Sequence, residues 1–376
     1  MDFFEKYRYQ KDNPEEFGID LKKIKRPQVL DESHLSNLLS HSIKVTKDIL
    51  PTVQKSIDEV FKKLKIENQF NFFITSDNYQ ANAACTLMSV SSKPDIILTS
   101  KLIELLNEKE LMFVIGHEIA HYIYQHSIYP NPNSTENRLT KLNVLNLSRA
   151  AEISADRIGF LSCGELESSL RANLKLASGL SEKYLNFKFS SYLDQLRELE
   201  THGKSDFQLW STHPSFLIRV QALIWFSMTK EYHEYFDTKK KGNYKIIEID
   251  KKIENSINKI IGNEVETSNK EILERALMWG SLSLYLSDKN FSKNEQDEFM
   301  TKFGKEKTNK ILSLLKISNR AMIDKKVENS FIEASNLLNN DKLKLINELK
   351  KIQQKTEGNL KTKTEIFKKF EKYLKS

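Results

Sequence analysis

The sequence contains few of the residues that cross-link or interrupt a chain. Among 376 residues there are two cysteines, Cys85 and Cys163, together with 11 glycines and 7 prolines. Two thiols do not make the disulfide framework of a small secreted protein, so we expect a cytoplasmic protein. The scarcity of glycine and proline favours helices joined by short connections.

Long apolar runs are also absent. No stretch of 18 apolar residues occurs, so the sequence predicts no transmembrane helix. The first residues, MDFFEKYRYQKDN, lack the apolar core and cleavage site of a secretory signal. With 39% hydrophobic and 29% charged residues, the composition is typical of a soluble protein.

Positive charge is concentrated toward one end of the chain. Residues 236–376 hold 30 Lys and Arg against 21 Asp and Glu, a net charge of +9, whereas residues 1–235 have a net charge of −2. The composition also shifts toward Lys, Asn and Ile near residue 236. We therefore expect two domains, 1–235 and 236–376, the second of them Lys-rich and helical.

The most informative stretch is LMFVIGHEIAHYIYQH, from Leu111 to His126. Its apolar flanks predict a buried helix, on which residues four apart lie on one face. His117 and His121 can therefore share one metal ion, while Glu118 lies close enough to polarise a water without being a ligand. This H-E-x-x-H pattern is typical of zinc metallohydrolases, in which such a helix supplies two of three protein ligands.

The third ligand is not a histidine six residues further on, because Ser127 occupies that position. His126 lies about 140° around the helix from His121 and should miss the metal. A better candidate is Glu152, which is followed one turn later by Asp156 and flanked by small alanines that allow close helix packing. Asp156 is then suited to hold a motif histidine by its second nitrogen. The alternative ligands are Glu165 and Glu167.

A second candidate element is the segment STHPSFLIR, residues 211–219. Pro214 suits the first turn of a helix and predicts that His213 lies at the helix start. An imidazole fixed near zinc can donate a hydrogen bond to a tetrahedral oxyanion, and Arg219 can bind the same oxyanion or a substrate carbonyl or carboxylate. The alternative is a capped helix with a solvated histidine.

Short apolar runs before the motif helix predict a small three-stranded sheet. The candidates are Gln69–Thr75, Ala81–Val90 and Ile96–Ser100, followed by a helix over Lys101–Asn107. The region from Asp31 to Leu64 has helical periodicity with a break at Pro51. An extended peptide can add to the edge of such a sheet beside the metal.

Three of these segments occur together in a known family. GHEIAH, EISAD and STHP…R have the order and spacing of the HtpX and CAAX prenyl protease family of gluzincin metallopeptidases (peptidase family M48), which the chain resembles over roughly residues 20–225. The resemblance implies one zinc ion per chain, held by His117, His121 and Glu152. It implies Glu118 as the general base and Asp156 as support for a zinc ligand.

The resemblance also implies that His213 and Arg219 lie near the scissile peptide. Five residues look like part of the family's substrate strand and are expected to bind substrate: Asn82, Ala83, Ile96, Ile97 and Leu98. Membrane-bound members have transmembrane helices and this sequence has none, which favours a soluble cytoplasmic member.

The C-terminal part carries helix signals but no chemical motif. Ser268–Glu271 and Ser292–Glu295 predict capping boxes, and residues 270–316 are similar to TerB-like helical domains. We find no nucleic-acid-binding motif. Apolar residues at helical intervals predict helices that pack on the peptidase, on each other or on a second copy, which would permit self-association or regulation.

A calcium site in this part is excluded. Asp288–Ser292 resembles the start of an EF-hand loop, but Lys293 stands where the loop needs Gly and Phe299 where it needs Glu.

Together these observations predict an α+β, mostly helical protein: a gluzincin-type catalytic domain with a small β-sheet beside the zinc helix, plus an all-α C-terminal domain. The expected function is that of a zinc metalloendopeptidase, which hydrolyses protein or peptide substrates with a zinc-bound water activated by Glu118. Two alternatives stay open. One is a metal-binding, catalytically gated binding or chaperone module regulated by its C-terminal helices, and the other is a zinc hydrolase of small amides or esters.

Overall fold

The computed structural model describes residues 2–19, 32–77, 79–86, 93–134, 138–202, 210–261, 264–317, 320–337, 339–357 and 359–375. The chain forms two compact units, residues 1–136 with 141–262 and residues 137–140 with 263–376. The predicted α+β, mostly helical class is confirmed. None of the described helices is long and apolar enough to cross a membrane.

The boundary between the units falls at residue 262 rather than near the predicted residue 236. The reason is helix α12 (Ile246–Ile261), which packs against α8 (Phe189–His202) and α10 (Phe216–Phe226) of the first unit. Its apolar side is buried there, as Ile249 and Ile253 show. The composition of α12 resembles that of the second unit, so the change in composition does not mark the change in packing.

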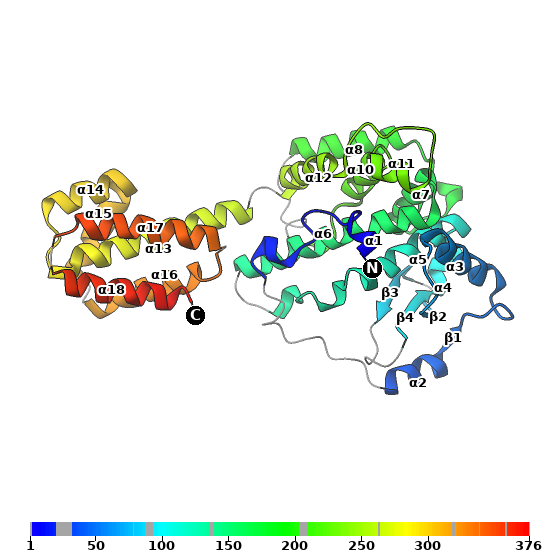
Figure 1. Ribbon diagram of the computed structural model, residues 1–376, viewed down its shortest axis with the longest axis horizontal. Coiled ribbons are helices and arrows are strands. Elements are labelled where there is room, and N and C mark those ends of the chain that lie inside the picture. Colours follow the sequence, from blue (N-terminus) through cyan, green and yellow to red (C-terminus); the bar gives the residue numbers. More distant parts are fainter. Residues whose placement is uncertain are drawn as a thin grey trace. The chain divides into compact units, whose positions relative to one another are not determined.

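A four-stranded sheet lies beside the helices of the first unit (Figure 1). The strands are β1 (Ser42–Lys44), β2 (Asn71–Thr75), β3 (Ala83–Thr86) and β4 (Asp95–Thr99), in the order β1-β2-β4-β3. β2 and β4 are parallel, and the two outer strands run antiparallel to their neighbours. The order leaves β3 at an edge, next to the helix that carries the H-E-x-x-H motif.

Two details of this region differ from the sequence prediction. Helix α2 (Glu32–His41) is followed directly by β1. These next residues were predicted as helix, but β2 offers a strand partner for Ser42–Lys44. The predicted strand over Ala81–Val90 is observed as β3, and residues 87–90 lie outside the described part of the chain.

The H-E-x-x-H motif lies on α5 (Glu108–Ile123), one of the most deeply buried helices of the first unit. Its start is fixed by a capping box in which the Asn107 side chain accepts from the backbone of Glu110 and the Glu110 carboxylate accepts from the backbone of Asn107. The helix packs against α3 (Pro51–Leu64) and α7 (Leu166–Ser178). Helical periodicity and the cap thus agree on the position of the motif.

α5 lies in close contact with the long helix α6 (Arg138–Cys163) at small residues. A Cβ added to Gly116 would come within 2.0 Å of Ser162 Oγ and 2.5 Å of its Cβ. A Cβ added to Gly159 would come within 2.7 Å of the Phe113 carbonyl oxygen. Both contacts are too short for any larger residue, so glycine at these two positions permits the close approach that brings the two helices' polar side chains together.

The described part of the first unit also contains shorter helices. They are α1 (Asp2–Glu5), α4 (Ser100–Leu105) and α11 (Lys230–Tyr235), with 3-10 turns at Pro14–Phe17, His126–Ile128, Pro132–Ser134 and Glu182–Tyr184.

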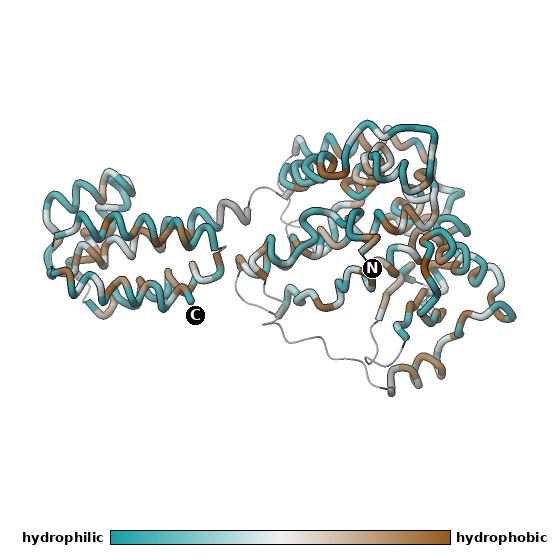
Figure 2. Tube along the Cα trace, in the orientation of Figure 1, coloured by the Kyte–Doolittle hydropathy of each residue, from teal (hydrophilic) through white to brown (hydrophobic). Residues whose placement is uncertain are grey.

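The second unit is helical in its described residues. Its helices are α13 (Glu264–Tyr285), α14 (Lys293–Phe303), α15 (Lys305–Ile317), α16 (Arg320–Ala334), α17 (Asn339–Lys355) and α18 (Leu360–Tyr373), with a 3-10 turn at Leu286–Asp288. Hydrophobic residues recur along α17 and α18 between hydrophilic ones (Figure 2). The apolar members pack into one core, in which Phe331 and Phe370 stack with ring centroids 4.5 Å apart.

One predicted capping box of the second unit is confirmed. Ser292 caps α14 and exchanges hydrogen bonds with Glu295. The prediction at Ser268–Glu271 is wrong, because α13 already begins at Glu264 and these residues lie inside it.

Candidate metal centre

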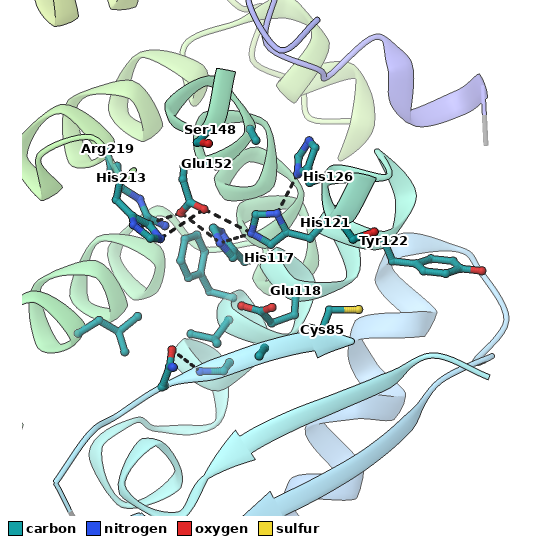
Figure 3. Close-up of a pocket in the computed structure, with 18 of the residues that line it drawn as sticks. Cys85, His117, Glu118, His121, Tyr122, His126, Ser148, Glu152, His213 and Arg219 are labelled. Carbon is teal, nitrogen blue, oxygen red and sulfur yellow. Dashed lines mark hydrogen bonds and ion pairs between the residues drawn. The ribbon is translucent and has the colours of Figure 1, made fainter. Parts of the chain in front are cut away.

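Two imidazoles and one carboxylate converge between α5 and α6 (Figure 3). His117 Nε2 lies 3.0 Å from His121 Nε2, and each of these nitrogens lies 3.5 Å from a Glu152 carboxylate oxygen. One atom of each residue lies within 4.8 Å of the other two, an arrangement that can hold a metal ion. His117 and His121 are four residues apart and so share one face of α5. The close approach of α6 brings Glu152 opposite that face.

The donor set fits zinc. Two neutral imidazole nitrogens and one carboxylate are a common catalytic zinc set, which leaves a position for water. Burial and the nearby His117 lower the pKa of His121 to about 3. Burial by itself would raise the pKa of Glu152, but His117 and Arg219 lower it to about 2. His121 is thus held neutral and Glu152 charged, the forms that bind a cation.

Asp156 lies one turn beyond Glu152 on α6 and is hydrogen-bonded to the first histidine. Its Oδ1 lies 3.0 Å from His117 Nδ1. Arg219 donates to both Asp156 oxygens, from Nε at 2.7 Å and from Nη2 at 2.6 Å. Burial alone would raise the pKa of Asp156, but the Arg219 guanidinium holds it well below its usual range. An ionised acceptor on Nδ1 leaves Nε2 of His117 facing the metal position.

Arg219 also contacts the third ligand. Its Nη1 lies 3.4 Å from Glu152 Oε2, and the guanidinium is largely buried. The sequence prediction placed this residue near the site on account of substrate or oxyanion binding. In the structure Arg219 contacts the carboxylates of both Asp156 and Glu152. The sequence of α10 alone does not predict these contacts.

Glu118 is buried in the same pocket, on the side where Cys85 of β3 lies (Figure 3). Burial raises the pKa of the Glu118 carboxyl, and Glu152 raises it further, while His117 lowers it. The backbone amide of Cys85 also lowers this pKa through a hydrogen bond. Glu118 is therefore next to the metal ligands but tied to the edge strand rather than to the ligand cluster.

His213 lies at the rim of the site. Its Nε2 is 3.6 Å from Glu152 Oε1, while most of its side chain is exposed. α10 begins at Phe216 with Ser215 as its N-cap, because the Ser215 hydroxyl accepts from the Leu217 amide, so His213 precedes the helix rather than opening it. Arg149 of α6 donates to the Ser211 carbonyl at 2.6 Å and ties this segment to the site.

The pocket at this centre has a volume of about 510 Å³. Asn82, Ala83 and Cys85 line it together with the metal-binding residues. Ile96 and Leu98, predicted to bind substrate, are instead fully buried in the core, because β4 lies between β2 and β3. Neither they nor Ile97 lines the pocket.

The alternative metal ligands lie elsewhere. Glu165 forms an ion pair with Lys109, and Glu167 forms one with Arg171. Among the described residues, neither joins the His117, His121 and Glu152 group.

Sequence reasoning missed the partners of His121 Nδ1. That nitrogen lies 2.8 Å from His126 Nδ1, and His126 Nε2 lies 2.9 Å from Asp12 Oδ2. His126 was expected only to miss the metal, and its five-residue separation from His121 was the sole signal available. Asp12 is 114 residues from His126 in the chain, so no local pattern links them.

Three features of this site are typical of metallopeptidases: a buried H-E-x-x-H helix, a glutamate from a second helix and a neighbouring sheet edge. Residues 50–131 and 133–224 match the model of Peptidase family M48. The chain is also similar to the plastoglobule-localized metallopeptidase 48, chloroplastic, of Arabidopsis thaliana, with 24% identity over 171 residues. The matched part covers 40% of this chain and 50% of that protein, so the chain spans about half the length of this curated relative.

No solved structure matches the chain. The matched residues 50–131 and 133–224 contain the motifs that resemble peptidase family M48.

Proposed function

We propose that the chain is a zinc metalloendopeptidase with His117, His121 and Glu152 as the metal ligands. The observation that carries this proposal is the convergence of the three side chains within 4.8 Å in a buried pocket that also contains Glu118. A non-peptide hydrolase has no comparable support, because the family match concerns a peptidase.

When bound, zinc supplies a Lewis acid that lowers the pKa of water toward about 7. Glu118 accepts a proton from the attacking water and delivers it to the leaving amine. Its buried position suits this exchange, because burial raises the pKa of the carboxyl toward the pH at which it must both take up and release a proton.

Asp156 and Arg219 hold the site in its working geometry. Asp156 fixes the ring of His117, and Arg219 neutralises the charge of Asp156 and of Glu152. Because Arg219 already has these two partners, its role is to position the carboxylates rather than to bind substrate alone.

His213 is suited to stabilise the negative charge that develops on the scissile carbonyl oxygen. Its Nδ1 lies 2.9 Å from the Thr212 hydroxyl, and its Nε2 faces the ligand cluster. A donor of this kind contributes most when it is already in place before the reaction.

The substrate backbone pairs with β3 in this proposal. Among the described strands, β3 is the edge strand next to the pocket, and Asn82 and Ala83 lie at its start. An extended peptide added there would pass Glu118 by continuing the sheet's hydrogen-bond pattern. The buried strand β4 supports β3 from behind, and its Ile96 and Leu98 belong to the core.

Cytoplasmic residence and a regulatory or self-associating role of the C-terminal helices stay predictions. Regulation by the second unit is compatible with this function.

The test is digestion of a peptide library by the full chain, with and without zinc chelation, beside the variant Glu118→Gln. We expect internal cleavage that chelation abolishes and that the variant loses by about 10²–10⁴-fold while it still binds zinc. Near-normal cleavage by Glu118→Gln would show that another group is the base. Release of terminal residues alone would exclude an endopeptidase.

A further inference from the structure

We propose that residues 2–19, which lie outside the family-matched region, complete the metal centre by supplying Asp12 as the outer member of a His121–His126–Asp12 hydrogen-bond chain that positions the ligand His121. This inference rests on the proposed metal centre, and it assigns roles to His126 and Asp12 that the motif does not include. Both are positioning residues, since neither reaches the reacting atoms.

The direction of each hydrogen bond follows from which nitrogen faces the metal. His121 Nε2 points to His117 and Glu152, so it carries the lone pair for the cation and the ring proton is on Nδ1. That N–H donates to His126 Nδ1, 2.8 Å away. His126 then has its own proton on Nε2, which donates to Asp12 Oδ2 at 2.9 Å. Each N–H of the His121–His126–Asp12 hydrogen-bond chain therefore has one acceptor.

Asp12 is held as an ionised acceptor by two further groups. The Tyr129 hydroxyl donates to Oδ1 at 2.7 Å, and Arg8 Nε donates to Oδ2 at 3.1 Å. Arg8 also donates from Nη2 to the Tyr129 oxygen at 2.8 Å, which closes the cluster. The Asp12 side chain is fully buried and that of His126 is 5% exposed, so water does not replace these partners.

The segment that carries Asp12 is fastened to the catalytic helices by its backbone. The Tyr9 amide donates to Ser154 Oγ of α6 at 2.9 Å. The Gln10 amide donates to Asp250 of α12 at 3.0 Å. Asp250 in turn pairs with Arg157 of α6. Asp12 therefore has a fixed position relative to α6, the helix that supplies Glu152.

The two motif histidines are thus oriented by different parts of the chain. His117 is held by Asp156 of α6, directly. His121 is held by Asp12, through the imidazole of His126. Loss of an outer partner of a metal-binding histidine typically weakens metal binding by about 10–100-fold.

The test measures zinc affinity of the full chain by competition with a chelator. His126→Phe keeps an aromatic ring between Tyr124 and Tyr129 but removes both hydrogen bonds. Asp12→Ala removes the terminal acceptor. We expect each to weaken zinc binding by about 10–100-fold. His233→Phe is the matched control, because His233 Nδ1 lies 2.7 Å from the hydroxyl of Thr238, five residues away, and takes no part in the His121–His126–Asp12 chain. The zinc affinity of this variant should equal that of the unchanged protein.

The double variant distinguishes a connected chain from two separate defects. If His126 transmits the effect of Asp12, then His126→Phe with Asp12→Ala binds zinc no more weakly than the worse single variant. Affinities that fall by the product of the single effects would overturn the proposal, and so would single variants with unchanged affinity.

Two further measurements cover variants that fold poorly. Thermal unfolding of the metal-free proteins shows whether the affinity change accompanies a general loss of structure, and Asp12→Asn then serves as a milder substitution of the same shape. Nitrogen-15 NMR of the zinc-loaded protein reads the tautomers directly. We expect His121 to be protonated on Nδ1 and His126 on Nε2. The opposite tautomer of His126 would contradict the proposed direction of the hydrogen bonds.

Failure of this inference can be told from failure of the proposed function. A full chain that binds no zinc overturns both. A full chain that binds zinc and cleaves peptides, with affinity that ignores His126 and Asp12, overturns only the hydrogen-bond chain.

Discussion

Both units of this protein have apolar cores, but the first also buries large cationic side chains completely. Among the described residues, the most deeply buried large side chains of the first unit include Arg149, Arg157 and Lys175. Those of the second unit are phenylalanines, such as Phe299 and Phe331. A buried cation needs a fixed partner, so substitution of either member of the pair is costly. Apolar contacts in a helical bundle carry no such requirement. The first unit therefore depends on buried ionic contacts as well as apolar packing, whereas the second depends mainly on the packing of its helices.

Removal of the metal should show this difference most strongly. A ligand that binds only the folded state stabilises it by about 4 kcal/mol when its free concentration is about 1,000 times Kd. We expect chelation to lower the unfolding temperature of the first unit and to leave that of the second unchanged. Calorimetry of the full chain with and without zinc measures both, and equal shifts would mean that the units unfold together.

Ion pairs should differ in the same direction. Lys175 lies 2.7 Å from Glu110, and both side chains are almost completely buried. Lys175→Met leaves this carboxylate short of a partner and should cost about 3 kcal/mol of unfolding free energy. In the second unit, Lys302 lies 2.8 Å from the partly exposed Glu348, and Lys302→Met should cost about 1 kcal/mol or less. Denaturant titration of the two variants measures both losses of unfolding free energy. Equal losses would contradict the difference between the units.

A Cβ added to a helical glycine should cost most where it meets an atom close to the neighbouring backbone. Gly116→Ala would force Cβ to within 2.5 Å of Ser162 Cβ, and we expect a loss of about 1–3 kcal/mol with weaker zinc binding. A Cβ at Gly280 of α13 would lie 2.8 Å from Leu349 Cδ2 and 3.0 Å from Phe331 Cζ. These atoms are at the ends of their side chains and alanine favours the helix, so Gly280→Ala should cost less than Gly116→Ala. Gly116→Ala combined with Ser162→Gly should recover stability, and failure to do so would place the strain elsewhere.

The smallest effect is expected at a helix start of the second unit. Ser292→Ala removes the N-cap of α14 and should lower the unfolding free energy by about 1 kcal/mol without changing zinc affinity or cleavage. A change in cleavage would instead indicate that the second unit regulates the first.

The sequence predicted the three side chains that the structure brings together, because helix geometry fixes the relation between residues four apart. His117 and His121 needed no tertiary information, and Glu152 followed from its spacing to Asp156 and the small residues around it. Strand order was not accessible in this way. The run Ile96–Leu98 has the same apolar character in a central strand as in an edge strand, so its burial behind β3 became visible only with the sheet assembled.

The other features that the sequence did not predict depend on contacts between segments far apart in the chain. Asp12 reaches His126 across more than a hundred residues, and α12 joins the first unit through isoleucines that would serve equally in the second. A local signal exists only where the partners share one helix or one turn.

The zinc content of the purified full chain, measured beside three single variants, tests the ligand assignment. We expect one zinc per chain in the unchanged protein and in Glu118→Gln, and loss of the metal in His121→Ala and Glu152→Ala. Zinc retained at full stoichiometry by Glu152→Ala, or lost from Glu118→Gln alone, would contradict the assignment of Glu152 as a ligand and Glu118 as the base.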